Sequence, residues 1–124
     1  MKYLIMIHSN PASREIWEGF TDEQRAEGFR YYAGLREELA ASGELIVTQA
    51  LADPATSTWV TVTGDATVTS DGPFAEVKEH LAGFFLVDCE SRERAVEIAA
   101  RCPEAMFGLI EVRPVLTSGG GVDM

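Results

Sequence analysis

The hydrophobic pattern of the chain consists of short apolar runs separated by longer segments of helical periodicity. Apolar runs of seven to nine residues, bounded by polar or turn-forming residues, are typical of buried strands. Such runs occur at Lys2–His8, Glu44–Leu51, Leu81–Cys89 and Phe107–Pro114. The pattern therefore predicts four strands that contribute to one hydrophobic core.

Two segments between these runs carry helix start and stop signals. Thr21–Gln24 forms a T-x-x-Q capping box, and the helix that it opens should run to about Ser42 and end at Gly43. Ser91 is placed to cap a second helix over Arg92–Arg101. We expect both helices to pack an apolar face against the sheet.

The remaining segments are predicted to be less regular. Asn10–Phe20 contains a proline and mixed polarity, which indicates a loop with a short helical turn around Ile16 and Trp17. The glycine-rich end of the chain lacks apolar periodicity. We therefore expect one domain over residues 1–116 and a flexible tail over residues 117–124.

A β-hairpin is predicted in the middle of the chain. Thr58–Thr63 and Ala66–Ser70 are rich in Thr and Val, and Gly64 and Asp65 between them suit a type I′ or II′ turn. The resulting order, β, α, β, hairpin, β, α, β, fits an α+β fold of the ferredoxin-like split βαβ type with an added hairpin. Both helices would then cover the same face of the sheet. The opposite face would expose apolar side chains, which predicts a homodimer.

Composition narrows the class of partner. The chain has 124 residues, 46% hydrophobic and 24% charged, and a formal net charge of -10. This charge, without any basic run, argues against nucleic acid or an anionic membrane as a partner. No apolar run reaches the length of a membrane span, and no signal-peptide pattern is visible, so a cytoplasmic protein is expected. Cys89 and Cys102 match no metal or redox spacing, so no metal or cofactor is expected.

One arginine falls inside the apolar arc of the first long helix. The apolar members of this arc are Phe29, Tyr32, Leu35, Leu39 and Ala40. Arg36 projects between them, and its side chain could extend to solvent along the sheet edge. The alternative is an inward cation that meets a carboxylate of Asp71, Glu76 or Glu79, or an anionic ligand.

The tetrapeptide Asp71–Phe74 (DGPF) has a structural and a functional interpretation. In the structural one, Asp71 accepts backbone hydrogen bonds in a turn, Gly72 takes a positive φ and Phe74 enters the core. In the functional one, the mouth of a cleft is lined by Asp71, Glu76, Lys78, Glu79 and His80, where neighbouring carboxylates and bases favour proton transfer. The spacing alone does not decide between the two.

The segment Asp71–Gly83 (DGPFAEVKEHLAG), followed by an apolar strand and a terminal IEVRPV, resembles the YCII-related family, in particular its DGPF-domain branch. The resemblance implies a ferredoxin-like fold that dimerises through its sheets into an α/β barrel. Some relatives carry a proposed His and Asp dyad with the His on the first helix. This chain has Tyr31 and Tyr32 there, so the dyad does not transfer.

Two hypotheses of function follow. The first is a small enzyme or ligand-binding barrel that acts without a cofactor on a small polar or aromatic metabolite. Its candidate catalytic residues are Asp71 and His80, and its candidate binding residues are Tyr32, Arg36 and Lys78. The second is a non-catalytic dimeric module, since the resemblance implies a regulatory setting near extracytoplasmic-function sigma factors. The sequence does not decide whether the protein is an enzyme.

Overall fold

Four antiparallel strands form the central sheet of the computed structural model, which describes residues 1–121. Their order is β2-β5-β1-β6, so the first and last strands in the chain lie side by side. These strands are β1 (Lys2–Ser9), β2 (Leu45–Ala50), β5 (His80–Asp88) and β6 (Ile110–Pro114). The α+β class and the antiparallel sheet agree with the sequence pattern.

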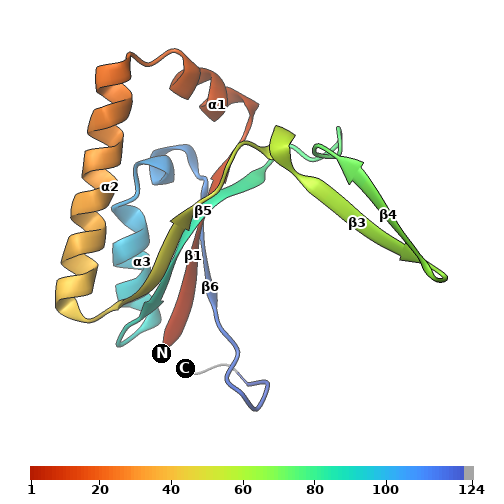
Figure 1. Cartoon of the computed structure of the whole chain (residues 1–124). Coiled ribbons are helices and arrows are strands. Elements are labelled where there is room, and N and C mark those ends of the chain that lie inside the picture. Colours follow the sequence, from red (N-terminus) through yellow and green to blue (C-terminus); the bar gives the residue numbers. More distant parts are fainter. Residues whose placement is uncertain (122–124) are drawn as a thin grey trace.

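Two helices cover one face of this sheet, as Figure 1 shows. They are α2 (Asp22–Ser42) and α3 (Arg92–Ala100). Alternate residues of β1 and β5 point toward them and form the core, because successive side chains of a strand lie on opposite faces. The largest fully buried side chains are Tyr3, Ile5, Leu35, Leu39, Ile98, Leu109, Val87 and Cys102.

The local signals of α2 are confirmed at both ends. The Thr21 hydroxyl accepts a hydrogen bond from the Gln24 N–H, and the Gln24 side chain accepts one from the Thr21 N–H. Gly43 ends the helix with φ 83°, in the left-handed region. Along the apolar arc Leu35 and Leu39 are buried, but Phe29 is 64% exposed. The arc therefore packs on the core only along its C-terminal half.

The predicted loop over residues 10–20 is wrong, because this segment contains the helix α1 (Pro11–Glu18). Asn10 and Ser13 form a second capping box, in which each side chain accepts from the backbone N–H of the other residue. Pro11 occupies the first helical position, where its missing N–H costs nothing. The proline that suggested a loop is thus part of a helix start signal.

The hairpin is formed by β3 (Thr58–Thr63) and β4 (Ala66–Asp71), which pair only with each other. It projects from the sheet as an arm, and every one of its strand residues is exposed. Figure 1 shows the arm pointing away from the helices. Gly64 has φ 61° and Asp65 has a negative φ, which fits a type II′ turn and excludes type I′.

The DGPF segment differs in part from its expected structure. Gly72 takes φ 82° as predicted, and its N–H donates to the Ser57 carbonyl at 2.7 Å. The Asp71 side chain, however, makes no hydrogen bond within residues 1–121, and Phe74 is 46% exposed. Phe74 packs against Trp59 of the arm with 4.6 Å between ring centroids. The turn prediction for Asp71 and the core prediction for Phe74 are therefore wrong.

The end of the chain also differs from expectation. The closing strand begins at Ile110, because Pro103–Phe107 forms the 3₁₀ turn η2. Residues 117–121 contain a turn in which the Gly120 N–H donates to the Thr117 carbonyl. The rest of the expected flexible tail, residues 122–124, lies outside the described residues.

Two further features bear on the expected barrel and on the question of a membrane span. The four strands of the sheet do not close into a barrel within one chain. Among the described residues, no helix combines the length and the apolar character that crossing a membrane would require.

Candidate functional site

A groove of about 770 Å³ lies between α1, the middle of α2 and the neighbouring ends of β1, β2 and β5. Residues of α1, α2 and η2 line the sides of the groove. Part of the floor is Gly83 of β5, where an added Cβ would lie 3.0 Å from the Gln49 carbonyl oxygen of β2. A side chain at Gly83 would therefore force the two strands apart beneath the groove.

Aromatic rings form the apolar wall of the groove. The Trp17 ring meets Phe20 and Phe29 edge to face, with centroid distances of 5.9 and 5.5 Å. All three side chains line the groove and are 38% to 64% exposed. Gly28 of α2 lies beside this cluster, where an added Cβ would make an ordinary van der Waals contact with the Trp17 ring at 3.7 Å. The cluster is too open to be core, so it presents ring surface to whatever fills the groove.

A hydrogen-bonded polar pair, Tyr32 of α2 and Glu104 of η2, also lines the groove. The Tyr32 hydroxyl donates a short hydrogen bond to the Glu104 carboxylate, and the Tyr32 ring stacks on Phe85 with 6.1 Å between centroids. Burial, followed by the hydrogen bond to Glu104, raises the pKa of Tyr32 far above its ordinary value. Tyr32 therefore keeps its proton at neutral pH and acts as a donor.

Cys102 lies behind this pair and is 1% exposed. Burial, with the nearby Glu104 carboxylate, raises the pKa of the Cys102 thiol to about 11. The thiol is thus neutral near pH 7, and such a thiol is a poor nucleophile. Cys102 belongs to the packing that supports Tyr32.

Two arginines line the groove without a protein partner. Arg14 of α1 is half-buried, and its Nη1 atom is buried with no hydrogen-bond partner among residues 1–121. Arg36 of α2 is exposed at the groove and forms no ion pair within the same residues. The prediction that Arg36 meets a carboxylate of the DGPF segment is therefore wrong, because that segment follows the projecting arm.

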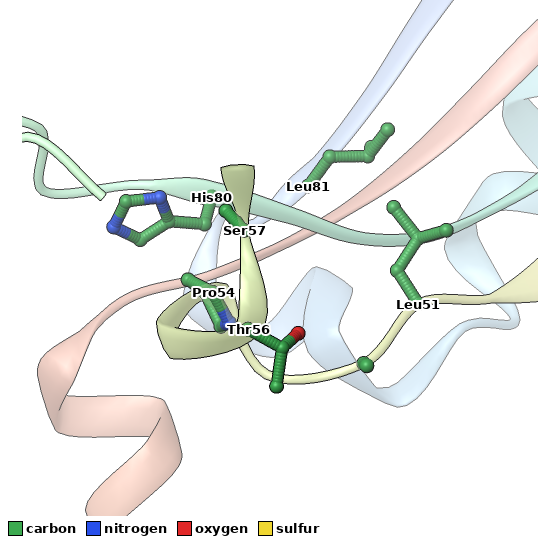
Figure 2. Close-up of a pocket in the computed structure, with 7 residues that line it drawn as sticks. Leu51, Pro54, Thr56, Ser57, His80 and Leu81 are labelled. Atoms are coloured by element: carbon green, nitrogen blue, oxygen red, sulfur yellow. The ribbon is translucent and has the colours of Figure 1, made fainter. Parts of the chain in front are cut away.

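His80 lines a smaller pocket of about 360 Å³, shown in Figure 2. Figure 2 places His80 across the pocket from Leu51, with Pro54 and Thr56 on the connecting turn between them. Leu51 and Pro54 also line the groove, so the two depressions adjoin. Residues 76–79, which lead into His80, are not helical.

The five candidate residues from the sequence do not converge in one chain. Tyr32 and Arg36 line the groove, and His80 lines the adjoining pocket. Asp71 lies at the end of β4, opposite Thr58, and lines neither depression. Lys78 also lines neither, and its ammonium donates to the Ala75 carbonyl at 3.5 Å.

Three residues that line the groove were not proposed as functional from the sequence: Arg14, Trp17 and Glu104. The Asn10 to Ser13 capping box was the available signal for α1, and a helix there would have placed Arg14 and Trp17 on adjacent turns. Glu104 had no comparable signal, because its contact with Tyr32 joins residues 72 positions apart. The groove is thus built mainly by contacts distant in sequence.

Other charged groups have structural partners. Arg113 pairs with Glu111, and Glu111 also contacts His8 Nε2 at 3.1 Å. These two partners, Arg113 first, hold the pKa of Glu111 below its ordinary value. Within residues 1–121 there is no group of three or more His, Cys, Asp and Glu side chains that could hold a metal ion.

Comparison with known proteins gives two matches. The model of a family described as the YCII-related domain matches residues 1–118. An uncharacterised protein of Rhizobium meliloti (strain 1021) is 28% identical over 117 residues, which cover 93% of this chain and 92% of that protein. The family match extends over α1, α2 and the arm, so it includes the whole groove.

Proposed function

We propose that this chain, which belongs to the YCII-related domain family, binds a small organic molecule in the open groove between α1 and α2. The groove itself carries this proposal. It combines aromatic walls with a few polar groups, among them the Tyr32 hydroxyl and the Glu104 carboxylate. Concave, mostly apolar sites with a few placed polar groups are the usual form of small-molecule sites.

The proposal includes cofactor-independent acid/base chemistry by Asp71 and His80, with Tyr32, Arg36 and Lys78 as binding residues. His80 supports it best, because its pocket shares Leu51 and Pro54 with the groove. A ligand that extends from the groove past these residues would reach the imidazole.

We also propose that the protein is a cytoplasmic homodimer whose sheets face each other in an α/β barrel. The support is the sheet face opposite α2 and α3, where Leu4, Phe84 and Leu86 remain partly exposed. An apolar face of this kind gains free energy from burial against a second copy.

Light scattering at micromolar concentration should give the mass of two chains, because an obligate interface buries more than about 1,200 Å². A species with the mass of one chain, 13.5 kDa, would contradict both the dimer and the barrel.

A second candidate function is a non-catalytic module that contacts a partner protein in a sigma-factor regulatory setting. The projecting arm favours it, because Val60, Val62 and Val68 are 62%, 67% and 52% exposed. A two-stranded hairpin with such exposure is marginally stable alone and gains from a protein contact.

The two tryptophans allow a direct test of small-molecule binding. Trp17 lines the groove, whereas Trp59 lies on the arm. In NMR spectra with a library of small aromatic and aliphatic compounds, binding in the groove should shift the indole N–H signal of Trp17 and leave that of Trp59 in place. A library that shifts neither signal, or only that of Trp59, would contradict the proposed function.

A further inference from the structure

We infer that the ligand of the groove is an organic carboxylate with an apolar, aromatic-sized body, and that Arg14 binds its carboxylate. Arg36 supplies a second positive charge at the same groove. This inference rests on the proposed function and adds to it the charge and the chemical class of the ligand.

The first support is the unsatisfied guanidinium of Arg14. Its Nη1 atom is removed from solvent, yet no acceptor among residues 1–121 takes its hydrogens. A buried donor without a partner is costly, and the cost is greater when the group is charged. Arg14 lines the groove, so a rotation of its side chain would bring the guanidinium to an acceptor bound there.

The second support is the distribution of charge. The chain has 20 acidic residues and only 10 Lys and Arg, yet neither Arg14 nor Arg36 pairs with a carboxylate among residues 1–121. The acidic side chains of the groove are already engaged: Glu104 accepts from Tyr32, and Asp53 accepts from the Ala55 N–H at 2.8 Å. The two guanidinium groups are therefore left for a ligand.

The third support is the match of shape and polarity. A guanidinium presents a planar pair of N–H donors, which fits a carboxylate with two parallel hydrogen bonds. The rings of Trp17 and Phe29 meet edge to face and stay 39% and 64% exposed, so ring surface is available to an apolar body. A ligand with a planar carboxylate on an apolar body would fit both the guanidinium donors and the aromatic rings.

Isothermal titration with 2-naphthoate and with neutral 2-naphthamide tests the inference, because the two compounds share a ring and differ in charge. The wild-type protein should bind the acid about tenfold or more tightly than the amide, since hydrogen bonds to charged groups are the stronger ones. Arg14→Gln should weaken the acid by about tenfold and leave the amide unchanged. Arg36→Gln should weaken the acid less, because Arg36 is more exposed.

Arg30→Gln is the matched control, because Arg30 is an exposed arginine of α2 that does not line the groove. It should bind both compounds as the wild type does. Arg14→Lys is the second variant, to be used if Arg14→Gln does not fold. It keeps the charge but loses the paired donors, so it should bind the acid with intermediate affinity.

Three outcomes separate this inference from the proposed function. Equal affinity for acid and amide, or unchanged acid binding in the Arg14 variants, overturns the carboxylate inference and leaves small-molecule binding standing. Binding of neither compound, together with an unmoved Trp17 indole signal in the library screen, overturns both. Selective loss of acid binding in Arg14→Gln, with a smaller loss in Arg36→Gln and none in Arg30→Gln, supports the inference.

Discussion

Leu35→Ala should lower the free energy of unfolding by about 2 to 5 kcal/mol, which is the usual cost of truncating a buried leucine. Leu35 is 2% exposed and packs in the core between α2 and the sheet. The truncation removes buried apolar surface and leaves a cavity that the rigid sheet cannot fill. Urea denaturation followed by circular dichroism measures the change.

Phe29→Ala is the matched comparison on the same helix. Phe29 is 64% exposed, so its truncation should cost about 1 kcal/mol or less, mostly through the lost edge contact with Trp17. It should nevertheless weaken naphthoate binding, because Phe29 lines the groove. Equal losses of stability in the two variants would contradict the burial of Leu35 and the exposure of Phe29.

The second large effect is a loss of stability at alkaline pH. The pKa of the Cys102 thiol is about 11 in the folded protein and 9.0 in an unperturbed thiol. Because the folded pKa is the higher one, the stability linked to this thiol is fully present below pH 9 and is lost as the pH rises toward 11. A difference of about two pKa units corresponds to about 3 kcal/mol. The raised pKa of Tyr32 adds a loss in the same direction, at higher pH.

The measurement is the free energy of unfolding at pH 8 and at pH 11, under reducing conditions, for the wild type and for Cys102→Ala. The variant should be less stable than the wild type at pH 8 but should lose less between the two pH values. An identical loss in both proteins would mean that Cys102 is not buried in the way the structure shows.

Elements with local signals were predicted well from the sequence. The capping box at Thr21 and the glycine at position 43 define α2 within a few residues, because both ends are set by contacts between close neighbours. α1 was missed although Asn10 and Ser13 carry the same kind of signal, because Pro11 was taken as a helix breaker. Because α1 was not predicted, Arg14 and Trp17 could not be placed together on one side of the groove.

The candidate site was harder to predict, for a different reason. Tyr32 and Arg36 share a helix face, so periodicity places them together, and both line the groove. Asp71 and Lys78 were grouped with them because the motif is compact in sequence. The arm that precedes the motif leads it away from α2 in the single chain. Periodicity gives the face of an element and not the direction in which a hairpin projects.

The central claim is that the groove between α1 and α2 is a ligand site, and a crystal structure of the protein with 2-naphthoate tests it most directly. The account predicts the naphthalene ring against Trp17 and Phe29, with the carboxylate within hydrogen-bond distance of Arg14. A groove that stays empty at saturating ligand, or one filled by side chains of a second subunit that also satisfy Arg14, would contradict it.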